Sequence, residues 1–431
     1  MNESGSDLFL ELLAAKDPAP LVHRLRAEDP VHFVPSLGFW FVTRHDDVKR
    51  LFNDPENATQ DRGAWEHFVP PPEGSMLRWF HDNSFARQGP EAHARFRRLF
   101  NGALTPRAVR RMDAQIREVV ERFAEPLRNR PGAVLDLMGE FTNPIPNTVI
   151  SRVTGVPPGA DELRFRELAQ GLIRGFFPFA PPEALALAES CLQEMAAWVR
   201  EMAAARRCTL GEDLISDLLR TQERDETLRD DEIVMLISVL IGAGSETTNL
   251  GGLVMIQTLL QHPEQLKRVR DDRSLVPSAV NEIMRFAFGG PAGLPRFAVR
   301  EFELRGKTIR KGQMLMLSFG GANRDPAVFE DPDRLDLERD ARELLVFGNG
   351  PHYCLGANLA RQEMGAMLDA ALDIVTPGSR VREDLQQFQQ MGLFQRPLNL
   401  PVEIAHQAPD GGADRDPAGA AVGGGAARRL V

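Results

Sequence analysis

The stretch Phe347-Gly348-Asn349-Gly350-Pro351-His352-Tyr353-Cys354-Leu355-Gly356 decides how this sequence is interpreted. Two glycines and a proline precede Cys354, and a helical pattern from Gly356 to about Ile374 follows it. This order places the cysteine at a helix N-terminus, where backbone N–H groups and the helix dipole favour a thiolate. A thiolate is the form of cysteine that binds iron as a soft, electron-donating ligand.

The other residues of this stretch support the same interpretation. Glycine lets a backbone approach a flat macrocycle closely, so Gly348, Gly350 and Gly356 are expected to contact such a group. Phe347 is expected to shield the sulfur from water. The alternative is a buried structural cysteine beside a glycine turn, and it leaves the spacing of these residues unexplained.

Composition excludes several classes of protein. The 431 residues are 43% hydrophobic and carry a formal charge of -10, which argues against general nucleic-acid binding. Three cysteines in a chain of this length form no disulfide framework and fit a reducing cytoplasm. No secretory signal opens the sequence, and the apolar run Ile233–Gly244 is too short to span a bilayer. We therefore expect a soluble, cytoplasmic monomer without a membrane span.

The pattern along the chain predicts a mainly α protein with small β-sheets. Two short strands are expected within Val31–Val42, followed by mostly helical sequence from Asp46 to Gln261. The strongest helix is predicted over Leu228–Gln261, with Asp230, Asp231 and Glu232 at its positive end. Further predictions are a helix at Ser278–Phe288 and strands at Phe297–Leu304, Lys307–Ile309 and Met314–Ser318. Residues 1–406 are expected to form one catalytic domain, and the Gly- and Ala-rich residues 407–431 a disordered tail.

The cysteine stretch resembles the haem-binding signature of the cytochromes P450, Phe-x-x-Gly-x-x-x-Cys-x-Gly. Its defined positions are occupied by Phe347, Gly350, Cys354 and Gly356. The resemblance covers about Pro18 to Ile404. It implies the cytochrome P450 fold, one haem b, and Cys354 as the axial iron ligand and the only thiolate on the iron.

The segment Ala243-Gly244-Ser245-Glu246-Thr247-Thr248 lies within the strongest predicted helix and resembles the family's oxygen-activation segment. Gly242 and Gly244 leave room beside a bound ligand. Thr247 can donate a hydrogen bond to the carbonyl of Ala243, four residues earlier. An acid next to an alcohol in an apolar helix provides a proton relay, so Glu246 and Thr247 are the catalytic candidates. The alternative is a glutamate that faces a loop and a threonine that packs in the core.

Glu282-Ile283-Met284-Arg285 matches the family's Glu-x-x-Arg pair, whose members lie three apart on a helix and can form an ion pair. The family adds a third member from a Pro-x-Arg-hydrophobic segment, here Pro332-Asp333-Arg334-Leu335, so Arg334 is predicted to join them. The expected role of all three is to support the cysteine loop.

Four basic residues resemble those that bind the haem propionates. They are His93, Arg97, Arg296 and His352. Two buried propionates need such charge-assisted partners. The alternative for His93 and Arg97 is an exposed basic helix face.

By resemblance, the substrate candidates are mostly large and apolar, which predicts a lipophilic small molecule. They are Met76, Trp79, Phe80, Phe176, Phe179, Leu240, Ala243, Gly290, Leu294 and Phe394. The implied reaction inserts one oxygen atom from O2 with electrons from NAD(P)H. The sequence contains no flavin or iron–sulfur fingerprint, so a separate ferredoxin or flavodoxin with its reductase is expected. A basic patch near the haem is expected to bind this partner, formed by Arg95, Arg98, Arg107, Arg110 and Arg111.

Two other functions remain open at this point. One is a haem-thiolate enzyme driven by peroxide, and the other is a non-catalytic haem sensor or ligand carrier. Neither has the same need for a proton relay at Glu246 and Thr247.

Overall fold

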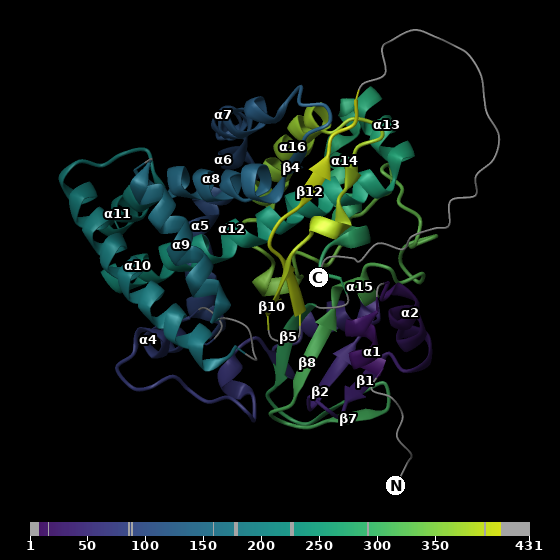
Figure 1. Ribbon diagram of the computed structural model, residues 1–431. Coiled ribbons are helices and arrows are strands. Elements are labelled where there is room, and N and C mark those ends of the chain that lie inside the picture. Colours follow the sequence, from purple (N-terminus) through teal and green to yellow (C-terminus); the bar gives the residue numbers. More distant parts are fainter. Residues whose placement is uncertain are drawn as a thin grey trace, which may run out of the picture.

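The computed structural model describes residues 8–406, apart from 16, 85–86, 88, 158, 176–179, 225–227, 291–292 and 392–393. The side chains of 99–103, 160, 224 and 390–395 are also outside the description. The tail predicted for 407–431 therefore lies outside the described residues. Helices surround α12 and fill the larger part of the molecule. The strands β1, β2, β8 and β5 lie together at the other end of the molecule (Figure 1).

Helices dominate the described chain, as the sequence pattern predicts. They are α1 (Leu8–Ala14), α2 (Ala19–Glu28), α3 (His45–Phe52), α4 (Met76–Asn83), α5 (Pro90–Leu104), α6 (Pro106–Arg111), α7 (Asp113–Ala124), α8 (Pro144–Thr154), α9 (Ala160–Arg174), α10 (Pro182–Cys208), α11 (Leu214–Arg224), α12 (Asp230–Gln261), α13 (Pro263–Asp271), α14 (Val276–Ala287), α15 (Phe319–Ala322) and α16 (Ala357–Ile374).

The strands form small sheets. They are β1 (Val31–Val34), β2 (Phe39–Val42), β3 (Ala58–Thr59), β4 (Val134–Asp136), β5 (Gly293–Ala298), β6 (Phe302–Leu304), β7 (Lys307–Ile309), β8 (Met314–Ser318), β9 (Arg380–Val381), β10 (Phe388–Met391), β11 (Phe394–Pro397) and β12 (Pro401–Glu403). The largest sheet has the order β1-β2-β8-β5-β3, and a second joins β4, β12 and β9. Two hairpins, β6–β7 and β10–β11, complete the set within the described residues.

Helix α12 is the central element of the fold. It begins with three acidic residues, and the Glu232 side chain accepts a hydrogen bond from the backbone N–H of Arg229. Its side chains are buried on several faces, and Gly251 and Gly252 lie against Met364 and Met367 of α16 so closely that a Cβ would clash. By length and composition α12 could cross a membrane, but in this fold it is mostly enclosed by other helices.

The predicted elements are confirmed with small changes of boundary. β1 and β2 are the two expected strands. They are antiparallel, with Val31 opposite Val42 and Val34 opposite Phe39. The single strand predicted from Phe297 to Leu304 is wrong, because the chain bends after Ala298 and forms β5 and β6 in different sheets. The C-terminal strands β9 to β12 were not predicted.

Candidate active site

The cysteine loop is a tight turn that ends at a helix. A 3₁₀ turn spans Gly350–His352, the Cys354 N–H donates to the Phe347 carbonyl at 2.8 Å, and α16 begins at Ala357. Gly348 and Gly350 both have φ of +72°, a region that other residues rarely adopt. A Cβ at Gly350 would lie 2.3 Å from the Asn53 side chain, so these glycines serve the turn and its packing on α3.

The surroundings of the Cys354 thiol shift its pKa in opposite directions. Burial raises the pKa of the Cys354 thiol, while the Gly356 N–H, Arg361 and Arg97 lower it by smaller amounts. The helix start therefore opposes the effect of burial on the thiol but does not outweigh it in the protein chain by itself. Coordination to a metal ion removes the proton from a thiol outright, so Cys354 would be a thiolate when it holds the iron.

A cavity of about 390 Å³ lies between α12 and the cysteine loop. Ala243, Gly244 and Thr247 of α12 form one wall, and Cys354, Leu355 and Gly356 form the opposite one. Most of the remaining lining is apolar and comes from α5, α8, α11, α12 and α16: Phe96, Leu104, Ile150, Val153, Leu214, Leu236, Val239, Leu240, Leu359 and Ala360. The cavity thus brings the predicted iron ligand and the predicted oxygen-activation segment face to face.

Thr247 lines this cavity and donates a hydrogen bond of 2.7 Å to the Ala243 carbonyl, as expected from its position in the helix. Glu246 faces elsewhere. It does not line the cavity, and its Oε1 accepts a 2.6 Å hydrogen bond from the Nε of Arg396 on β11. No sequence pattern pointed to this partner, which lies 150 residues further along the chain.

The four predicted propionate-binding residues gather at one edge of the cavity. The rings of His93 and His352 are 4.1 Å apart, and burial together with neighbouring basic groups lowers the pKa of His352 to about 4. Burial lowers the pKa of Arg296 to about 10, and its guanidinium lies 4.8 Å from the Phe52 ring. Arg97 donates to the Tyr353 carbonyl at 2.7 Å.

No carboxylate within the described part of the chain forms an ion pair with Arg97 or Arg296. Arg296 is buried and Arg97 is half-buried, and a buried cation without a counter-ion is costly, so two carboxylate groups from a ligand would satisfy them. A soft sulfur ligand, a flanking apolar cavity and these basic residues together fit a haem with buried propionates.

The Glu-x-x-Arg pair is fully buried and forms the centre of a hydrogen-bond and ion-pair network. Glu282 accepts hydrogen bonds from Arg285 at 2.7 and 2.8 Å, and both side chains have no exposed area. The prediction for Arg334 is wrong: its side chain is 67% exposed and pairs with Asp336. Arg339 is the third member, because its Nε lies 3.2 Å from Glu282 and its side chain is only 10% exposed. The loop after Arg334 turns back and brings the later arginine inward.

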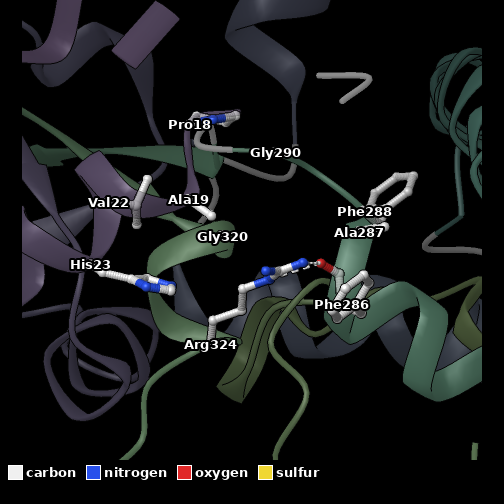
Figure 2. A pocket seen from close by; sticks show the side chains of 10 residues that line it. All are labelled: Pro18, Ala19, Val22, His23, Phe286, Ala287, Phe288, Gly290, Gly320 and Arg324. Atoms are coloured by element: carbon white, nitrogen blue, oxygen red, sulfur yellow. Dashed lines mark hydrogen bonds between the residues drawn. The ribbon is translucent and has the colours of Figure 1, made fainter. Parts of the chain in front are cut away.

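The predicted substrate residues are only partly brought together. Leu240 and Ala243 line the cavity, whereas Met76, Trp79, Phe80 and Leu294 do not. Phe176 and Phe179 lie outside the described residues, as does the side chain of Phe394. Gly290 lines a different hollow of about 30 Å³ between α2 and the end of α14, where Arg324 reaches across to the Phe286 carbonyl (Figure 2). A hollow of this size holds about one water molecule.

Glu363 of α16 is a cavity residue that the sequence pattern did not single out. It is 3% exposed, and its Oε2 has no hydrogen-bond partner among the described residues. Burial raises the pKa of Glu363 well above its usual range, which favours the protonated acid. The available signal was an acidic residue next to the buried apolar residues Met364, Ala366 and Met367 of α16.

Comparisons with known proteins agree with this geometry. A family model described as Cytochrome P450 matches residues 32–375. Nocardicin C N-oxygenase of Nocardia uniformis subsp. tsuyamanensis is 34% identical over 90% of this chain and 96% of its own. The cytochrome P450 monooxygenase PikC of Streptomyces venezuelae is 33% identical over 85% of this chain and 88% of its own. The crystal structure of epothilone D-bound cytochrome P450epoK superposes with a TM-score of 0.81 at 28% identity, over 94% of this chain and all of that one.

Proposed function

This chain belongs to the cytochrome P450 family and is a haem-thiolate monooxygenase, and from that premise we propose that it oxygenates a lipophilic small molecule inside the α12 cavity. Electrons would come from NAD(P)H through a separate ferredoxin or flavodoxin and its reductase. We further propose that the protein acts as a cytoplasmic monomer. One observation carries the proposal: Cys354 and Thr247 face each other across a single, largely apolar cavity.

The residues of this chain have separate tasks in the proposed reaction. A haem with a thiolate ligand supplies the cleavage of dioxygen. Cys354 would hold the iron, and His93, Arg97, Arg296 and His352 would hold the propionates. Thr247 would accept a hydrogen bond in the cavity and pass a proton from Glu246. The apolar wall would orient the substrate and exclude water.

The names of similar proteins support hydroxylation and epoxidation as candidate reactions. The relatives include an epothilone C/D epoxidase and a mycinamicin IV hydroxylase/epoxidase. The leucine, isoleucine and valine side chains of this cavity offer the same kind of apolar surface. We therefore propose a hydroxylation or epoxidation of an apolar carbon skeleton.

The test is a screen of lipophilic compounds for shifts of the ferric haem spectrum, followed by turnover of each binder. NADH, a ferredoxin and its reductase should give oxygenated product. Product formed with peroxide alone, and none with NADH, would favour a peroxide-driven enzyme. Ligand binding without either reaction would favour a haem sensor or carrier.

Thr247→Ala is expected to uncouple electron use from product formation. Loss of the hydroxyl removes a proton-relay group that lines the cavity, and such groups contribute ~100-fold or more to a rate. The ratio of product formed to NADH consumed should fall and hydrogen peroxide should rise, with haem content unchanged. Thr247→Ser, which keeps the hydroxyl, is the matched control. An unchanged ratio in the alanine variant would show that Thr247 only packs in the wall.

Charge reversal on the basic patch is expected to slow reduction by an acidic ferredoxin. Arg98, Arg107, Arg110 and Arg111 are exposed on α5 and α6. Arg95 is different, because it pairs with Glu232 at 3.0 Å and is not available to a partner. These encounters are weak and electrostatically steered.

The rate of reduction should therefore fall as salt rises, since the Debye length shrinks from ~10 Å at 0.1 M to ~3 Å at 1 M. Arg98→Glu and Arg111→Glu should slow it further without changing substrate affinity. Arg342→Glu, at a side chain that is 88% exposed and belongs to no part of the patch, is the control. Equal rates in all three variants would place the docking face elsewhere.

A further inference from the structure

The ion pair between Glu246 and Arg396 joins the proposed proton relay to the β10–β11 hairpin. The two side chains are 11% and 15% exposed, so water screens the pair only weakly. Neither residue lines the cavity, although Thr247, the neighbour of Glu246, does. The acid of the relay is thus held on the hairpin side of α12.

This contact limits what Glu246 can do in the conformation described. Its Oε1 accepts the guanidinium N–H at 2.6 Å. That oxygen has to leave Arg396 before the carboxylate can turn from the hairpin toward the cavity. Opening of the ion pair is therefore a step that precedes proton transfer to Thr247.

The hairpin offers Arg396 a second partner. Gln389 lies directly opposite Arg396 in the antiparallel register of β10 and β11. Residues in such a pair project from the same face of the hairpin and are close neighbours. The Oε1 of Gln389 is buried and has no hydrogen-bond partner among the described residues. A guanidinium has five N–H donors, so it can move from Glu246 to this acceptor.

We infer that Arg396 is a positioning residue that controls proton delivery by exchanging between Glu246 and Gln389. With Arg396 on Glu246, the acid is kept out of the cavity and the relay is closed. With Arg396 on Gln389, Glu246 is free to serve Thr247. This inference rests on the proposed function, because it assigns a control to the relay of the same site.

The test compares Arg396→Gln, Glu246→Gln and the double variant as haem-loaded enzymes with redox partners. In Arg396→Gln the relay is always open. NADH oxidation without substrate should rise several-fold, the ratio of product to NADH should fall, and the solvent deuterium isotope effect should decrease. In the Glu246→Gln background the Arg396 substitution should cause no further change in coupling. Both substitutions act on the same relay, so their effects are not additive. Arg380→Gln, at an exposed ion pair with Glu403, is the control.

Two further variants keep the test decisive if Arg396→Gln folds poorly. Arg396→Lys retains the charge and should keep coupling near that of the wild type. Gln389→Leu removes the second partner, so it should slow turnover while coupling stays high. If Arg396→Gln has an effect of equal size with and without Glu246, or if coupling is unchanged in every variant, the role inferred for Arg396 is overturned while the proposed function stands. If the wild-type enzyme forms no product, both the proposed function and the role of Arg396 are overturned.

Discussion

Cys354→His is expected to abolish the thiolate-type Soret band of the reduced, CO-bound protein and to remove monooxygenase activity, which is the largest effect of any substitution proposed for this protein. A neutral imidazole donates less electron density to iron than a thiolate, and the thiolate is what favours O–O cleavage. No other cysteine can replace it. Cys191 is buried in α10 and Cys208 is exposed at the end of that helix, and neither lines the cavity.

The measurement is the absorbance spectrum of the reduced protein under CO, together with haem content. Cys191→Ala and Cys208→Ser serve as controls, and both should keep the thiolate band. A thiolate band that persists in Cys354→His would mean that another cysteine binds the iron.

Glu282→Gln is expected to cause the largest loss of stability. Glu282 is the shared acceptor of Arg285, Arg339 and the backbone N–H of Asp336. Removing its charge leaves two arginines in the interior without a counter-ion, which costs about 3–5 kcal/mol for a buried pair. The free energy of unfolding should fall by that amount.

The damage should reach the cysteine loop through hydrogen bonds. Arg285 also donates to the Asn323 carbonyl at 2.8 Å, and the Asn323 side chain accepts from the backbone of Leu345 at 2.9 Å. Leu345 precedes Phe347 by two residues, so a displaced Arg285 disturbs the chain that leads to Cys354. Haem retention should fall together with stability.

Thermal and denaturant unfolding of the haem-loaded protein would measure both effects. Glu121→Gln is the matched control, because Glu121 pairs with Arg128 on the surface and is 54% exposed. Surface pairs contribute about 0–1 kcal/mol. Equal losses in the two variants would contradict a special role for Glu282.

The sequence predicts those parts of the site that depend on local spacing. Cys354 and its glycines, the Thr247–Ala243 bond and the Glu282–Arg285 pair are all set within one turn or one helix. Contacts across the fold were not predictable. Arg339 replaces Arg334 because of the path of one loop, and Arg396 reaches Glu246 from a hairpin that no pattern predicted.

The same reason explains the incomplete prediction of the cavity wall. Ile150, Val153 and Leu214 come from α8 and α11, whose apolar residues look like ordinary core in the sequence. Only the packing of these helices beside α12 decides which of their side chains face the cavity. Size and polarity could be predicted for the substrate, but not the residues that contact it.

Because Arg97 and Arg296 have no carboxylate partner among the described residues, we expect the stability of this chain to depend on bound haem. A ligand that binds only the folded chain stabilises it by mass action, by about 4 kcal/mol when its concentration is a thousandfold above Kd. Bound propionates would give Arg97 and Arg296 their counter-ions at the same moment. Chains made during haem shortage lack this gain and are open to proteases for longer. Starved cells would therefore lose the polypeptide itself instead of storing an inactive reserve.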